Sequence, residues 1–65
     1  MFQEGELVRW FDTYAYSDIV KDSGLGIVVK IYKSETFTFY QVYKSKYQLL
    51  QSYSEQDLQK YRSKK

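Results

Sequence analysis

The side chains that could carry out acid–base chemistry in this chain are almost all carboxylates. Its 65 residues contain no histidine and no cysteine, which removes the commonest general base, the thiol nucleophile and the commonest zinc ligands. Two pairs of acids are close in sequence, Glu4 with Glu6 and Asp18 with Asp22, but neither fits a calcium-loop motif. Since acidic side chains are mostly solvated at protein surfaces, we expect a protein that is not an enzyme and that uses no metal or cofactor.

The segment Gly24-Leu25-Gly26 is the only place where glycines cluster. A phosphate-binding loop needs a further glycine, a following Lys-Ser or Lys-Thr pair, and a helix after it. None of these is found here, because residues 27–33 alternate as a strand, with Ile27, Val29 and Ile31 on one face, so that one face is buried and the other half-exposed. We expect the two glycines to adopt positive φ in a turn at the base of a loop.

Tyrosine gives the strongest indication of a binding surface. The chain contains eight tyrosines, four phenylalanines and one tryptophan, which are more rings than the interior of so small a domain can hold. Exposed tyrosines are favoured at protein interfaces because they bury a large area at low entropic cost. The predicted protein-binding residues are Tyr14, Tyr16, Asp18, Tyr32 and Tyr43. Strand propensity and cross-strand stacking are the alternative explanation for any one of these rings.

Lysines offer a second interpretation, in which the chain binds single-stranded nucleic acid by stacking bases on tyrosines and pairing phosphates with cations. The residues for this interpretation are Lys30, Lys33, Lys44, Lys46, Lys60 and Arg62. The net charge is +2, but four of the ten cations lie in the last six residues, so residues 1–59 carry six positive and eight negative charges. Because nucleic-acid binding relies on a clustered basic face, this balance favours protein binding, with the lysines protecting strand edges.

A small β domain is predicted to position these side chains. Alternation of apolar and polar residues, with Gly, Ser and Asp at the breaks, predicts four strands and a short final one. Their expected ranges are 6–11, 27–33, 37–44, 47–53 and 59–61. Residues 12–23 show no sustained periodicity and are predicted to form a long loop, whereas Ser54 with Asp57 predicts a short 3-10 turn. A longer helix from residue 48 is the alternative, because Leu50, Ser54 and Leu58 also have helical spacing.

The predicted core is built from the inward side of these strands. It contains Val8, Trp10, Tyr40, Val42 and Leu58. Ile19 and Val20 are expected to anchor the long loop to this core, because they are the aliphatic pair within it. Tyr47 and Tyr53 are expected at the rim or facing outward, since the interior is too small for every ring.

Four segments together resemble a known fold family. They are GELVRW at 5–10, GIVVKIY at 26–32, YQVYKS at 40–45 and SYSEQDL at 52–58. The first two are similar to the opening strands of KOW and Tudor-type members of the SH3-like barrels. The whole series is similar to short, mostly uncharacterised SH3-like proteins encoded by tailed bacteriophages. The resemblance implies a small five-stranded barrel, in which the loop at 12–23 is longer than that of KOW members.

These observations predict one all-β domain over residues 1–61, followed by a basic, frayed tail at 62–65. No apolar run is long enough to cross a bilayer, so we expect no membrane contact and a cytoplasmic location. The resemblance implies a phage-encoded accessory protein that is attached to the virion or binds a host protein. The expected contact surface is the loop at 12–23, and homo-oligomers through the same surface would give so small a chain additional core.

Overall fold

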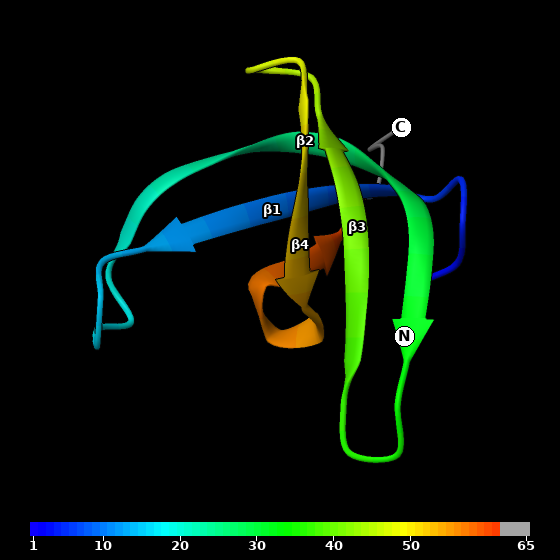
Figure 1. Ribbon diagram of the computed structural model, residues 1–65. Coiled ribbons are helices and arrows are strands. Elements are labelled where there is room, and N and C mark those ends of the chain that lie inside the picture. Colours follow the sequence, from blue (N-terminus) through cyan, green and yellow to red (C-terminus); the bar gives the residue numbers. More distant parts are fainter. Residues whose placement is uncertain (62–65) are drawn as a thin grey trace.

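The computed structural model describes residues 1–61, which form five strands and one short 3-10 helix (Figure 1). In chain order the elements are β1 (Leu7–Thr13), β2 (Val20–Lys33), β3 (Thr38–Lys44), β4 (Leu49–Ser54), η1 (Glu55–Asp57) and β5 (Leu58–Lys60). The all-β fold and the 3-10 turn before the last strand are therefore confirmed, and the alternative of a long C-terminal helix is wrong. The predicted frayed tail lies outside the described residues.

The strands form a single antiparallel sheet in the order β4-β3-β2-β1-β5. β2 is 14 residues long, so its first half pairs with β1 and its second half with β3. Figure 1 shows β2 arching over the molecule between these two partners, so that the β1–β2 pair crosses behind the β3–β4 pair. Among residues 1–61 the ladders leave β4 and β5 at the two edges of the sheet. Closure of the sheet into a barrel stays a prediction.

Eight side chains form the buried core. They are Phe2, Val8, Trp10, Val28, Tyr40, Val42, Tyr53 and Leu58. Val8, Trp10, Tyr40, Val42 and Leu58 are among them as predicted, because alternation in β1 and β3 is regular. Phe2 was not predicted, and its ring packs edge-on against Tyr40 with 5.3 Å between the ring centroids. The prediction that Tyr53 lies at the rim or faces outward is wrong, since only 5% of its surface is exposed.

The buried face of β2 differs from the predicted alternation. Val28 is completely buried, whereas Ile27 and Val29 are both exposed. Beyond Val28 the β2–β3 register is irregular between Val28 and Lys30, where one extra residue of β2 has no partner. Such a bulge reverses the alternation beyond it, and Ile31 therefore packs against the core again.

Half of the predicted loop at 12–23 is β structure. Asp12 pairs with Asp22 and Thr13 with Val20, so that only residues 14–19 connect β1 to β2. The pairing was hidden from the sequence because this part of β2 is polar on both faces, which removes the period-two signal. Ile19 and Val20 do not anchor the segment, because both side chains are exposed.

The two clustered glycines lie within β2 and do not form the predicted positive-φ turn. Gly5 is the only glycine of the chain with positive φ, at 88°. Gly24 pairs with Trp10, and a Cβ added there would lie 2.7 Å from the indole atom Cζ2. A Cβ at Gly26 would lie 2.6 Å from the carbonyl oxygen of Tyr43. The glycines are therefore needed for space beside a large ring and a neighbouring strand.

Candidate functional site

The β1–β2 hairpin extends well beyond the rest of the sheet and ends in an exposed turn (Figure 1). We call residues 14–20 the hairpin tip. The turn is closed by its own backbone, since Tyr14 N–H donates to the Ile19 carbonyl at 3.1 Å and Ser17 N–H donates to the Tyr14 carbonyl at 3.1 Å. The Ser17 hydroxyl also accepts from Ile19 N–H at 3.0 Å. The tip is thus a turn whose backbone is defined by local hydrogen bonds.

Four apolar side chains of the hairpin tip face solvent. Tyr14 is 55% exposed, Ile19 67% and Val20 48%, and Tyr16 is fully exposed. None of them belongs to the core cluster. Neighbouring exposed apolar side chains are uncommon on soluble proteins unless another molecule covers them. The tip therefore presents four exposed apolar side chains that the core does not use.

Tyr16 has a backbone conformation that bulky residues rarely adopt. Its φ is 58°, in the left-handed region. For a residue with a Cβ this region costs roughly 1–2 kcal/mol, and such residues are often found at functional sites. The hydrogen bonds of the turn hold the residue there, and the outcome is a tyrosine ring that projects freely from the end of the hairpin.

An open groove lies at the base of the tip. Its lining comes from the hairpin and from η1 and consists of Phe11, Thr13, Ser17, Asp18, Val20, Gln56 and Asp57. Phe11 supplies a half-buried apolar ring, while Asp18 and Asp57 supply two carboxylates. The groove is therefore suited to a segment of another molecule that offers an apolar side chain beside a positive charge.

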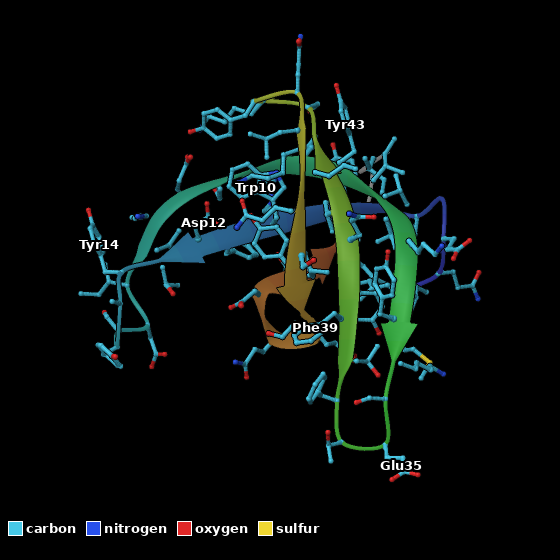
Figure 2. The ribbon with its side chains drawn as sticks, in the orientation of Figure 1. Trp10, Asp12, Tyr14, Glu35, Phe39 and Tyr43 are labelled. Carbon is cyan, nitrogen blue, oxygen red and sulfur yellow. The ribbon has the colours of Figure 1, made fainter. Side chains whose placement is uncertain are left out.

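The predicted protein-binding residues fall into two separate places. Tyr14, Tyr16 and Asp18 lie together at the hairpin tip, as expected from their proximity in sequence. Tyr32 and Tyr43 lie on the outer face of the sheet, opposite the core, where they pair with Phe39 and Ile27 respectively. In Figure 2 Tyr14 lies at the left end of the hairpin, whereas Tyr43 lies apart from it near the upper end of β3. A single partner surface cannot include all five residues unless it wraps around the sheet.

Two exposed residues of the hairpin tip were not predicted to lie at the surface. Ile19 and Val20 were predicted as core anchors, and their exposure adds to the contact surface. An aliphatic pair in a polar segment has the same composition whether it turns inward or outward. No sequence signal distinguishes the two cases, because the direction is set by the register of β1 on β2.

Lys44 is not available as a surface cation, which corrects its place in the nucleic-acid set. The residue is 3% exposed, and its Nζ lies 3.3 Å from Oδ2 of Asp12 and 2.8 Å from Oε1 of Gln51. The same ammonium group lies 4.1 Å from the centroid of the Trp10 ring. It lies 5.6 Å from the centroid of Tyr53, whose hydroxyl donates to Asp12 Oδ1 at 2.6 Å. We call these five side chains the lysine box.

The lysine box joins the base of the hairpin to the centre of the sheet. Asp12 comes from β1, Lys44 from β3, and Gln51 and Tyr53 from β4. Burial, followed by the hydrogen bond to Asp12, raises the pKa of Tyr53 far above its ordinary value. The phenol therefore keeps its proton and remains a donor to the carboxylate. In Figure 2 Trp10 and Asp12 lie next to one another at the middle of the molecule.

A second set of polar contacts holds the other strand of the hairpin. Asp22 lies opposite Asp12 in the β1–β2 ladder and accepts from Lys46 Nζ at 2.6 Å, from the Tyr47 hydroxyl and from Ser23 N–H at 2.9 Å. These hydrogen bonds, with Lys46 the largest contributor, lower the pKa of the Asp22 carboxyl to about 2. Both strands are thus tied to the β3–β4 region, which fixes the direction in which the hairpin projects.

The remaining predicted cations do not gather on one face. Lys46 pairs with Asp22, and Lys60 lies 3.7 Å from a carboxylate oxygen of Glu6. Lys30 lies over the exposed ring of Tyr32, with 5.7 Å from Nζ to the ring centroid, and Lys33 follows at the end of β2. Arg62 lies outside the described residues. Among the described members of this set that form no ion pair, Lys30 lies over an exposed ring, which is the arrangement that base stacking would use.

Residues 1–61 contain no group of three or more acidic side chains arranged to hold a metal ion. The same residues contain no helix of the length and apolar character that spanning a membrane requires. A comparison with known protein families, curated proteins and solved structures gives no match.

Proposed function

We propose that this chain is a non-enzymatic protein-interaction module that contacts its partner through the hairpin tip. The observation that carries the proposal is the exposure of Tyr14, Tyr16, Ile19 and Val20 at the end of the hairpin, where none of the four side chains belongs to the core. Rigid aromatic side chains next to aliphatic ones are the composition of interface hot spots. The two sets of polar contacts at the hairpin base support the proposal, because a fixed tip loses less entropy on binding.

The groove beside the tip supports a particular kind of partner. A segment that places an apolar side chain on Phe11 and a lysine or arginine near Asp18 and Asp57 would use the whole surface. The resemblance to short SH3-like proteins of tailed bacteriophages favours a phage-encoded accessory protein. Its partner would be a bacterial host protein in the cytoplasm or another component of the virion.

A pull-down from bacterial lysate tests the proposal. Wild type, the double variant Tyr14→Ala/Tyr16→Ala and the control Tyr32→Ala are immobilised in equal amounts, after circular dichroism has shown that all three are folded. Tyr32 is a suitable control because its side chain is exposed to nearly the same extent as that of Tyr14 but lies on the outer face of the sheet. The tip variant should lose the captured proteins and the control should keep them. Identical captured sets would refute the choice of surface.

The second candidate is single-stranded nucleic-acid binding, which the contact between Lys30 and the ring of Tyr32 favours. The burial of Lys44 and the pairing of Lys46 remove two of its predicted cations. Titration of fluorescent single-stranded oligonucleotides at two salt concentrations separates the candidates. Steeply salt-dependent binding that Lys30→Ala weakens would favour this function over protein binding.

A further inference from the structure

Within residues 1–61, one edge of the sheet has no further strand paired with it. β4 (Leu49–Ser54) pairs with β3 on one side, and among residues 1–61 no strand pairs with its other side (Figure 1). Leu49, Leu50, Gln51 and Ser52 are all exposed. Backbone N–H and C=O groups on an open edge are a template for pairing with a further strand.

This edge lacks the features that usually prevent pairing. Tyr47 to Ser54 contains no charged residue, no glycine and no proline, and the β3–β4 register has no irregularity. The opposite edge differs, since β5 is only three residues long and ends at Lys60. Charges, prolines, bulges and short strands are the devices that protect edges. β5 has two of these devices, whereas β4 has none.

A row of exposed apolar side chains leads across the outer face to the open edge. Leu7 pairs with Ile27, Ile27 with Tyr43, and Tyr43 with Leu50, one residue from each of four neighbouring strands. We call these four residues the outer row. Each is between 36% and 50% exposed. The row reaches the edge at Leu50, where it ends without a neighbour in the described chain.

We propose that β4 pairs antiparallel with β4 of a second copy of this chain, giving a two-fold symmetric dimer with a continuous ten-stranded sheet. The proposal is independent of the partner of the hairpin tip. A second copy fits because the edge is uncharged, so that self-pairing brings no like charges together. A two-fold axis at Leu50 places this residue against Leu50 of the second copy and Leu49 against Gln51 of the second copy. In this register the two outer rows join into one.

The size of the contact sets the strength that we expect. A paired strand of six residues is roughly 20 Å long, and its side chains cover less area than the roughly 1,200 Å² of a standard interface. The dimer is therefore weak, with a dissociation constant on the order of 10–100 μM. Such a constant is measured by sedimentation equilibrium of the full chain over about 1 μM to 1 mM.

Charge substitutions at the two edges test the proposal. Leu50→Lys places two positive charges opposite one another in the dimer, whereas the control Gln59→Lys adds the same charge to the exposed face of β5. Leu50→Lys should raise the dissociation constant at least about tenfold, while Gln59→Lys and the tip variant Tyr14→Ala/Tyr16→Ala should dimerise as wild type does. A wild type that is monomeric throughout, or a Leu50→Lys variant that dimerises normally, overturns the proposal.

Cross-linking tests the register. The chain has no cysteine, so Leu50→Cys introduces a single thiol, and its partner is the same residue of the second copy. Mild oxidation with copper phenanthroline should form the covalent dimer at least about tenfold faster for Leu50→Cys than for Gln59→Cys, because paired strand residues have their Cβ atoms within about 5.5 Å. Equal rates for the two variants would overturn the pairing. Since tip variants leave both experiments unchanged, failure here is separate from failure of the proposed function.

Discussion

The ammonium group of Lys44 on β3 lies 3.3 Å from a carboxylate oxygen of Asp12 on β1, beneath the ring of Trp10. Lys44 is almost completely buried, whereas Asp12 is 22% exposed. The other oxygen of Asp12 accepts from the Tyr53 hydroxyl. One carboxylate therefore compensates a buried charge and satisfies a buried phenol, and it does so at the base of the hairpin that carries the proposed contact surface.

Removing the carboxylate should be more damaging than removing the cation. Asp12→Ala leaves Lys44 buried without its counter-charge, and we expect it to lower the free energy of unfolding by about 3 kcal/mol. Lys44→Met keeps contact with the rings and leaves Asp12 bonded to Tyr53 and in reach of water, so the expected loss is about 1 kcal/mol. Urea unfolding followed by the fluorescence of Trp10, the single tryptophan, measures both.

The double variant Asp12→Ala/Lys44→Met is the control for this pair. The double variant should lose less free energy of unfolding than the two single variants lose in sum, because removing both charged groups leaves no unpaired charge in the core. Losses that add, or a Lys44→Met variant that is as unstable as Asp12→Ala, would show that the ion pair does not determine the stability of the lysine box.

Asp22 should make stability depend on pH in the acid range. Its folded pKa is lowered from 3.8 to about 2, first by the hydrogen bond from Lys46 and then by that from Tyr47. A carboxyl with a lowered folded pKa stabilises the fold above its unfolded pKa, and this stabilisation is lost as the pH falls from about 4 to about 2. The urea midpoint of wild type should exceed that of Asp22→Asn at pH 6, and the difference should vanish near pH 2. A difference that persists at pH 2 would contradict this assignment.

The strands were predictable where alternation is undisturbed, as in β3, where Tyr40 and Val42 are buried as expected. The same alternation points Lys44 inward, but a lysine is buried only when a counter-charge meets it, and Asp12 is 32 residues away in sequence. The bulge at Val29 was invisible, because apolar residues on both faces give no sign of a shift in register. These failures share one cause, namely that each feature is decided by a contact between distant strands.

Gly24 should be required for the packing of Trp10. Gly24→Ala would place Cβ 2.7 Å from the indole, and moving a buried ring in a packed core costs about 1–3 kcal/mol. Gly5→Ala is the matched control, since its φ of 88° gives a backbone cost of about 1 kcal/mol while its Cβ would meet nothing within 4 Å. Both variants lose stability, but only Gly24→Ala should shift the tryptophan emission of the folded protein. An unchanged emission spectrum in Gly24→Ala would show that the ring accommodates the methyl group.

Tyr16 should stabilise binding at the expense of folding. Asparagine adopts the left-handed region more readily than tyrosine, so Tyr16→Asn should raise the free energy of unfolding by up to about 1 kcal/mol while it removes an exposed ring from the hairpin tip. Tyr14→Asn is the control, because Tyr14 does not have positive φ and its substitution should bring no gain in stability. Urea unfolding and the bacterial pull-down are measured on the same preparations. A more stable Tyr16→Asn variant that captures the same proteins as wild type would separate the backbone strain from recognition, whereas a less stable variant would show that the turn favours tyrosine for its contacts within the chain.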